Sequence, residues 1–263
     1  MTNDEFQRLL RQMGEELYRD MPWRQDTRPY YVLVSELMLQ QTQVDRVVPK
    51  FEAFIKRFPN ERALAAAPLA DVLVQWQGLG YNRRAKFLHE AAKKIVELGE
   101  FPQDEVGLVA LPGVGKNTAG AILAYAYNQP AIFIETNVRA VYIHHFFADS
   151  DTVDDKDIRK LLEDTIDHKH PREFYWSLMD YGVYLKKQGI KPARSKHYVK
   201  QSPLKGSVRE VRGQIIAILT EGETTVAMLV ARYDGDTRFE LALSGLVADG
   251  LVIIDDDMVY LTK

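Results

Sequence analysis

The segment 111–137 constrains the backbone of this chain more than any other stretch. Pro112 ends a preceding helix, and Gly113 and Gly115 can turn the backbone through positive φ without steric cost. Apolar residues then recur at helical spacing over residues 116–127. We therefore predict a tight turn that leads directly into a helix N-terminus.

A turn of this kind presents backbone amides at the positive end of a helix dipole, which attracts phosphate. Lys116 adds a full positive charge beside them. The turn lacks the Gly-Lys-Ser/Thr sequence of a nucleotide P-loop, so we expect the phosphate to belong to a nucleic-acid backbone. A short apolar helix over 101–111 would complete a helix-hairpin-helix. A plain joint between two helices, without a ligand, is the alternative.

The composition describes a globular chain of 263 residues with 46% hydrophobic content, which is enough to bury a core. The chain has no cysteine, which excludes disulfides, a thiolate nucleophile and an iron–sulfur cluster, and we expect a cytoplasmic protein without membrane spans or a signal peptide. The histidine pairs 144/145 and 168/170 do not offer three ligands, so we assign no metal.

A formal net charge of −3 argues against indiscriminate coating of nucleic acid, so any DNA contact needs a local positive face. Residues 186–212 offer such a face, because their lysines and arginines are opposed only by Glu210. A solvated basic linker is the alternative interpretation.

Hydrophobic periodicity predicts short helices joined by short loops, and hence an all-α fold up to residue 195. The expected helices cover residues 4–19, 31–44, 45–57, 61–67, 69–76, 83–98, 101–111, 116–127, 138–147, 154–166 and 172–184.

The C-terminal residues 207–263 have a different composition and resemble a winged helix-turn-helix. Helices are expected over 208–219, 225–233 and 237–249, followed by two strands in 251–261. The third of these helices carries more acid than base, and the turn between the strands is triply acidic. Since phosphate attraction normally supplies affinity for DNA, a protein contact or a packing role is as well supported as base reading.

Glu36 lies in the middle of the strongly apolar segment 31–44, where an ionised carboxylate is costly unless it is partnered or functional. Residues 35–44, with the sequence SELMLQQTQV, resemble the catalytic-helix motif of MutY-type adenine DNA glycosylases, which belong to the endonuclease III superfamily. The resemblance covers roughly residues 16–186 and includes the hairpin.

That resemblance implies a two-lobed helical helix-hairpin-helix glycosylase domain over residues 1–195. One lobe would comprise about 31–130, and the other 1–30 plus 131–195. A basic linker, 196–206, would lead to the winged-helix-like module.

The resemblance also implies the catalytic roles. Glu36 would protonate the purine leaving group, and desolvation of a buried carboxyl would raise its pKa as that role requires. Glu135 stands where the family has an aspartate that stabilises the sugar cation, and its extra methylene moves the carboxylate by about 1.5 Å. Asn137 follows in the same motif. A structural hydrogen bond for Glu36 and a dipole-favoured acid at a helix start for Glu135 are the alternatives.

Asn117 stands where lyase members of the superfamily carry a lysine that attacks the sugar. Asparagine cannot be that nucleophile, and Lys116 faces about 100° away on the helix. We therefore expect a monofunctional hydrolase without lyase activity.

The remaining site residues follow from the same resemblance, with ordinary packing as their alternative. Gln41 and Tyr81 would wedge into the duplex where the target base leaves the stack. The expected DNA-binding residues are Gln41, Thr42, Tyr81, Gly113, Val114, Gly115, Lys116 and Thr118. The expected base pocket consists of Arg19, Met21, Trp23, Arg24 and Asp180.

Two family features are absent from the sequence: four cluster-ligating cysteines expected near Lys186, and the domain that recognises 8-oxoguanine opposite the adenine. We expect no cofactor beyond a monovalent cation at the hairpin carbonyls. The predicted function is a monomeric adenine DNA glycosylase of base excision repair that acts on double-stranded DNA with a mispaired or damaged base. The alternatives are a thymine, uracil or hypoxanthine glycosylase, and a catalytically silent DNA-binding protein.

Overall fold

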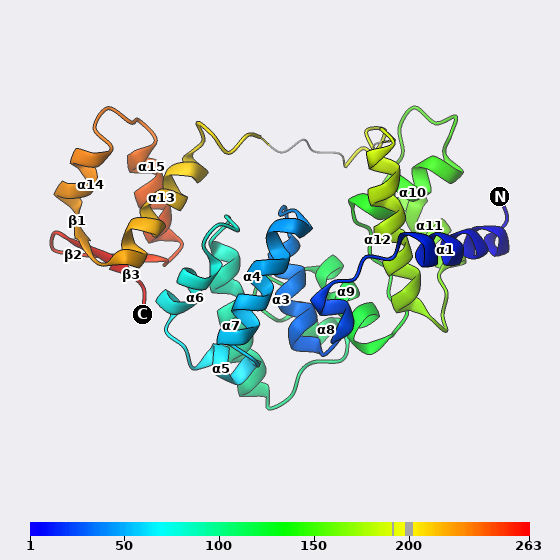
Figure 1. Ribbon diagram of the computed structural model, residues 1–263, viewed down its shortest axis with the longest axis horizontal. Coiled ribbons are helices and arrows are strands. Elements are labelled where there is room, and N and C mark those ends of the chain that lie inside the picture. The colour runs from blue at the N-terminus through cyan, green and yellow to red at the C-terminus, as the bar shows by residue number, and fades with distance from the viewer. Residues whose placement is uncertain (191, 198–201) are drawn as a thin grey trace. The chain divides into compact units, whose positions relative to one another are not determined.

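The computed structural model describes residues 1–190, 192–197 and 202–263. They form two compact units, and almost all of their regular structure is helical (Figure 1). The first unit comprises residues 1–33, 102–110 and 114–200, and the second 34–101, 111–113 and 201–263. The expected helical fold with a small C-terminal hairpin is confirmed, whereas the domain boundaries stay a prediction.

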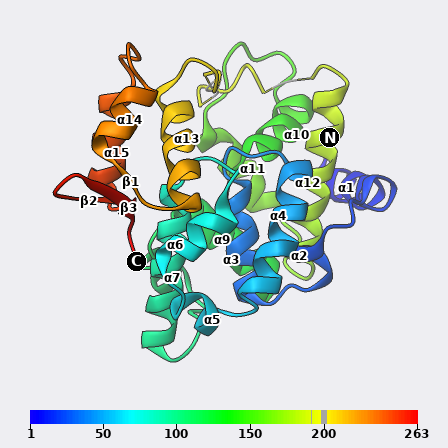
Figure 2. The same cartoon turned by 60° about the vertical axis from the view of Figure 1, so that its left-hand side comes forward.

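The first unit is built around one long helix, α12, against which α1 and α10 pack (Figure 1, Figure 2). Its helices are α1 (Asn3–Leu17), α2 (Pro22–Gln25), α8 (Glu105–Val109), α9 (Lys116–Tyr127), α10 (Thr136–Phe146), α11 (Asp155–Thr165) and α12 (Pro171–Lys187).

Small residues on α12 and α1 let the helix backbones approach closely. A Cβ at Gly182 would lie 2.6 Å from the Cβ of Asn137, and one at Gly14 would lie 2.1 Å from Oγ of Ser177. Real side chains do not tolerate such distances, so glycine is required at both positions. The close contact at Gly182 fixes the first turn of α10, where Asn137 lies.

The second unit contains the central helices of the sequence and the C-terminal module. Its elements are the C-terminal part of α3 (Pro29–Leu39), α4 (Val44–Arg57), α5 (Glu61–Ala65), α6 (Leu69–Trp76), α7 (Arg83–Leu98), α13 (Val208–Glu221), β1 (Thr224–Thr225), α14 (Val226–Arg232), α15 (Phe239–Ala248), β2 (Val252–Asp255) and β3 (Met258–Leu261).

The C-terminal module has a three-stranded antiparallel sheet in the order β1-β3-β2. The two strands predicted in 251–261 are present as the β2–β3 hairpin, in which Val252 pairs with Leu261 and Asp255 with Met258. Asp256 forms the turn with a φ of 51°. Strand β1 was not predicted, because two residues carry no readable alternation.

The helix predicted over 31–44 is wrong at its C-terminal end. α3 stops at Leu39, Gln41 adopts a φ of 58°, and α4 begins at Val44. The helix predicted over 101–111 is likewise shortened to α8, whose first turn is capped by the Asp104 side chain. Within the described residues, no helix has both the length and the apolar run required to cross a bilayer.

Candidate functional site

The predicted hairpin is present, with α8 packed against α9. Gly113 has a φ of 78°, and a Cβ there would lie 2.7 Å from that of Phe87, so the turn requires glycine. Gly115 is the N-cap residue of α9, and no side chain in the described part of the chain caps that helix end. Lys116 is exposed beside it, and Val114 is buried under the turn. The hairpin therefore offers an exposed helix N-terminus with a cation.

Asn117 connects the hairpin helix to the segment that carries the predicted catalytic carboxylate. Its Nδ2 donates to the backbone oxygen of Ile134 at 2.9 Å, and its Oδ1 accepts from the Ile134 backbone nitrogen at 3.5 Å. Thr118, which follows on α9, is half-buried. The Asn117 amide thus bonds both ways to the residue that precedes Glu135.

Glu135 occupies the N-cap position of α10, but its side chain makes no capping hydrogen bond. Glu135 thus stands at a helix start, as the alternative interpretation of a dipole-favoured acid expects. The side chain is half-buried, and burial raises the pKa of its carboxyl, opposed by the positive charges of Arg139 and Lys186.

The two cations near Glu135 differ in their other partners. Arg139 is held by a two-fold ion pair with Asp155, at 2.8 Å and 2.7 Å. Lys186 is partly buried, and this burial, followed by repulsion from Arg19, lowers its pKa. Glu135 thus lies in a partly desolvated, positively charged environment, where a carboxylate can interact with a developing cation.

Asn137, the third residue of the predicted catalytic segment, is half-buried between α10 and α12. Its Nδ2 lies 3.6 Å from Sδ of Met179, a weak acceptor, while its buried Oδ1 has no hydrogen-bond partner among the described residues. A buried acceptor without a donor is uncommon and is expected at functional positions.

Glu36 lies on α3 and is half-buried between the fully buried Ser35 and Leu37. The chain therefore keeps this carboxylate on an apolar helix, in the second unit, whereas Glu135 belongs to the first. The general-acid role and the raised pKa of Glu36 stay predictions.

The two predicted wedge residues share an unusual backbone conformation. Gln41 has a φ of 58° and Tyr81 a φ of 49°, values that are costly for a residue with a side chain. Such strain persists only where the surroundings enforce it, and it gathers at functional sites.

Arg84, which the sequence analysis missed, enforces both loop conformations. Its guanidinium is buried and donates to the backbone oxygens of Leu37, Met38 and Gln40, which end α3. It also donates to the oxygens of Leu79 and Gly80 before Tyr81, and to Thr42 Oγ1. Burial lowers the pKa of Arg84 to about 10, so the side chain stays charged at neutral pH.

A sequence signal for Arg84 exists. Together with Leu88, Ala91, Ala92 and Ile95 it forms the buried face of α7, where a charged residue is as anomalous as Glu36 is on α3. The hydroxyl of Thr42, a predicted DNA-binding residue, donates to the backbone oxygens of Gln40 and Leu79. Thr42 therefore belongs to the same hydrogen-bond network as Arg84.

Two of the predicted base-pocket residues, Arg19 and Arg24, bind the carboxylate of a third, Asp180. Asp180 receives two hydrogen bonds from Arg24, at 2.6 Å and 3.0 Å, and one from Arg19 Nε at 2.6 Å. Asp180 and Arg24 are 3% and 6% exposed, and Met21 and Trp23 are also buried. The cluster ties α2 to α12, so Asp180 acts through the arginines that it holds.

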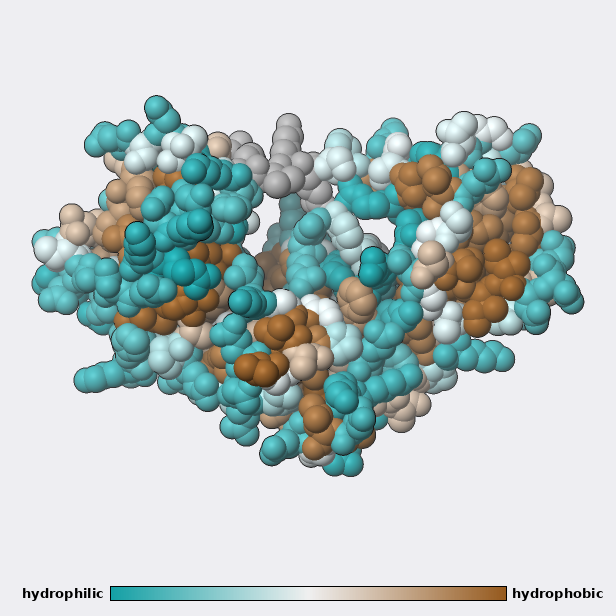
Figure 3. Space-filling model, turned by 180° about the vertical axis from the view of Figure 1, so that it is seen from behind, coloured by the Kyte–Doolittle hydropathy of each residue, from teal (hydrophilic) through white to brown (hydrophobic). Residues whose placement is uncertain are grey.

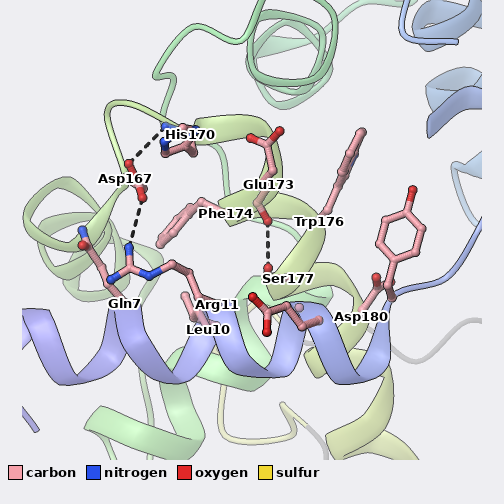
Figure 4. A pocket seen from close by; sticks show the side chains of 13 residues that line it. Gln7, Leu10, Arg11, Asp167, His170, Glu173, Phe174, Trp176, Ser177 and Asp180 are labelled. Atoms are coloured by element: carbon pink, nitrogen blue, oxygen red, sulfur yellow. Dashed lines mark hydrogen bonds and ion pairs between the residues drawn. The ribbon is translucent and has the colours of Figure 1, made fainter. Parts of the chain in front are cut away.

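A cavity of about 420 Å³ lies in the first unit beside this cluster (Figure 4). Leu10 and Arg11 on α1 face Phe174 and Trp176 on α12 across it, and Asp180 lies at one end. Neither Glu36 nor Glu135 lines the cavity, which is therefore separate from the predicted catalytic carboxylates.

Within the basic segment 186–212, residues 194 and 195 are bound to other parts of the first unit, and contact of the segment with DNA stays a prediction. Arg194 donates to the backbone oxygens of Phe147, Ala148 and Ser150, and Val153 forms a bridge with Ser195. These contacts anchor the segment where cluster-ligating cysteines would be expected, and the chain has no cysteine for such a cluster. Two of its predicted cations, Lys191 and Lys200, lie outside the described residues.

His145 belongs to the first of the two histidine pairs. His145 Nε2 lies 2.9 Å from the Tyr181 hydroxyl, and burial lowers its pKa to about 4. Across the ranges that the structure describes, no three His, Asp or Glu side chains come together as metal ligands.

The C-terminal module exposes apolar and acidic side chains. A hydrophobic patch covers part of it (right-hand side of Figure 3), and the exposed apolar residues of α14, α15 and β2 are Met228, Val230, Leu241, Val247, Ile253 and Ile254. The turn between β2 and β3 is formed by exposed aspartates. The apolar patch and the aspartate turn themselves carry no positive charge, which phosphate binding requires.

Comparisons with known proteins identify the family of the chain. Residues 34–168 match the family described as HhH-GPD superfamily base excision DNA repair protein. An adenine DNA glycosylase from Mycobacterium tuberculosis is 35% identical over 89% of this chain and 86% of its own length.

Two further matches differ in coverage. An adenine DNA glycosylase from Buchnera aphidicola is 38% identical over 64% of this chain, which spans only 48% of that relative's length. The structure of a thermostable thymine-DNA glycosylase is 25% identical, with a TM-score of 0.64 over 69% of this chain and 86% of that one. The chain belongs to the HhH-GPD superfamily of base excision DNA repair proteins.

Proposed function

We propose that this DNA glycosylase removes a mispaired adenine from double-stranded DNA by hydrolysis and leaves the strand intact. The observation that carries the proposal is the bond between Asn117 and Ile134. It couples the hairpin helix, the expected phosphate contact, to the segment of Glu135. The absence of lyase activity is supported by the residue type, because the amide of Asn117 cannot serve as the amine that a lyase needs. The names of the Mycobacterium and Buchnera relatives support adenine as the base.

The proposed reaction breaks the bond between the adenine nitrogen and the sugar carbon C1′. Glu36 donates its proton to the leaving base, and the electron pair of the broken bond stays with the base. Glu135 stabilises the resulting sugar cation, a division of labour like that in glycoside hydrolysis. Water then adds to C1′, and its proton returns to Glu36.

A second candidate is excision of thymine or uracil on the same scaffold. The thymine-DNA glycosylase structure supports it, because that protein matches 69% of this chain at a TM-score of 0.64. A shared fold does not decide which base is excised, because specificity depends on the residues of the site.

A panel of duplexes separates the candidates. Each carries adenine, thymine, uracil or hypoxanthine opposite guanine or 8-oxoguanine, and abasic sites are scored after treatment with hydroxide. The proposal expects adenine release, with strand breaks appearing only after hydroxide. Release of thymine or uracil instead of adenine would favour the second candidate, and binding without any release would contradict both.

The proposed enzyme acts as a monomer on one duplex. Titration of a lesion-containing duplex with protein should therefore saturate at one chain per site. Saturation at two chains per site would contradict the monomer.

A further inference from the structure

Tyr81 is held in its strained backbone conformation by residues that precede and follow it in the sequence. It follows Gly80, which has a φ of 70°, and is itself at 49°. Arg84, from the first turn of α7, fixes the preceding backbone oxygens and places its guanidinium carbon 5.4 Å from the centre of the Tyr81 ring. These contacts set the backbone of the loop and leave the hydroxyl end of the ring to another partner.

That partner is Arg209, from the first turn of α13 in the C-terminal module. Its guanidinium carbon lies 5.1 Å from the centre of the Tyr81 ring, and its Nη1 donates a hydrogen bond to the Tyr81 hydroxyl. A guanidinium at this distance from an aromatic ring is attracted by the electrons of the ring. The Tyr81 side chain is therefore contacted by two arginines that are far apart in the sequence.

The other hydrogen bonds of Arg209 go to residues 202 and 203, in the predicted linker just before its own module. Nη2 donates to the backbone oxygen of Ser202 at 2.7 Å, to Oγ of Ser202 at 3.0 Å and to the backbone oxygen of Pro203 at 3.4 Å. These acceptors are neutral, and none of the ion pairs found between described residues includes Arg209. Among the described residues Arg209 thus has no carboxylate partner that would explain its place, and Tyr81 is its contact with the loop between α6 and α7.

Two further contacts attach the C-terminal module to the part of the second unit that carries Tyr81. Gln77 Nε2 donates to Thr220 Oγ1 of α13. Lys86 Nζ of α7 donates to the Asp249 backbone oxygen at 2.9 Å, and the Asp249 carboxylate pairs with Arg212. α13 also packs against α6. The position of Arg209 is therefore fixed by contacts on either side of the Tyr81 loop.

We propose that Arg209 is a positioning residue that holds Tyr81 ready for insertion into the duplex, so that the C-terminal module serves the glycosylase through this side chain. The inference rests on the proposed function, because Tyr81 must enter DNA for its position to matter. In this role the module does not bind phosphate itself, so its acidic and apolar surface is no obstacle. The side chain that enters DNA is Tyr81, and the module fixes its direction.

The test compares Arg209→Ala with Arg232→Ala, an exposed arginine on α14 of the same module, which removes the same charge without touching Tyr81. Single-turnover base release is measured at saturating enzyme, and flipping is followed by 2-aminopurine fluorescence beside the target base. Arg209→Ala should slow both by about tenfold, the value of one hydrogen bond to a charged group. Duplex affinity should stay within about twofold, and Arg232→Ala should leave the rates unchanged.

A double-mutant cycle tests whether Arg209 acts through Tyr81. In a Tyr81→Ala background, Arg209→Ala should cause no further slowing. Additive losses, equal effects of the two arginine variants, or faster release by Arg209→Ala would overturn the proposal. The last result would mean that Arg209 restrains Tyr81 from entering DNA.

A readout without DNA separates this inference from the proposed function. The thermal midpoints of Tyr81→Phe, Arg209→Ala and the double variant should be non-additive, because both single changes remove the same hydrogen bond. Non-additivity with no base release by the wild-type protein would contradict the proposed function but retain the contact. Additive midpoints would contradict the contact itself.

Discussion

Asn117 and Ile134 are joined by hydrogen bonds in both directions, from Asn117 Nδ2 to the Ile134 oxygen and from the Ile134 nitrogen to Asn117 Oδ1. The bonds connect the first turn of α9 to the residue before Glu135. A phosphate contact at the hairpin is therefore mechanically coupled to the carboxylate that is proposed to face the sugar.

Asn117→Lys should introduce lyase chemistry. The variant places an amine at the first turn of α9, where it can attack the sugar carbon and form a Schiff base. Borohydride should trap a covalent adduct with the variant and little or none with the wild-type protein. Asn117→Ala is the control, since it removes the amide bonds without adding an amine. Efficient trapping by the wild-type chain would show that another lysine reacts.

Glu135→Gln should lower base release by about 100-fold or more, because the charge that stabilises the sugar cation is lost. The same variant should be more stable than the wild-type protein at pH 7. The folded state raises the pKa of Glu135 above 4.5, so the unfolded chain loses this proton first as the pH rises. The folded protein therefore loses stability as the pH rises from the pKa of the unfolded chain to the pKa of the folded protein. Glutamine has no proton to lose.

Thermal unfolding at several pH values measures this effect. The gain in midpoint for Glu135→Gln should be present at pH 7 and should vanish as the pH falls below 4.5, where both states of the wild-type protein are protonated. A gain that is independent of pH would instead mean that the amide makes new contacts.

The hairpin can be tested without unfolding it. Gly115 has ordinary backbone angles, and a Cβ at this position would have no neighbouring atom within 4 Å, so Gly115→Val should fold but obstruct phosphate approach. Lys116→Ala should weaken binding and reduce the slope of log affinity against log salt by about one. Salt titrations of duplex binding measure both variants. Unchanged affinity and slope in both would remove the hairpin from the DNA interface.

Arg84→Met should reduce the free energy of unfolding by about 3 kcal/mol, because several buried backbone oxygens lose their donor. Arg83→Met is the matched control, since Arg83 is exposed and its ion pair with Asp249 is a surface contact. Urea unfolding should show little change for the control. Equal losses in the two variants would mean that the bonds of Arg84 contribute nothing specific.

Sequence periodicity predicted most helices because each has an apolar face that must be buried, and it predicted the hairpin because glycine and proline act locally. It did not predict the end of α3 at Leu39, because the donor that ends this helix, Arg84, comes from a distant part of the chain. The bond between Arg209 and Tyr81 was missed for the same reason. Asp180 was correctly placed among the arginines only through the family resemblance, since no local pattern pairs α2 with α12.

The central claim is that Glu36 protonates the leaving adenine, and single-turnover base release by Glu36→Gln tests it most directly. The amide keeps the size of the side chain but cannot donate the proton, so release should fall by about 100-fold or more while duplex affinity stays within about twofold. Thermal unfolding checks that the variant is folded. Residual release above about a tenth of the wild-type rate, at unchanged affinity, would contradict the general-acid role of Glu36.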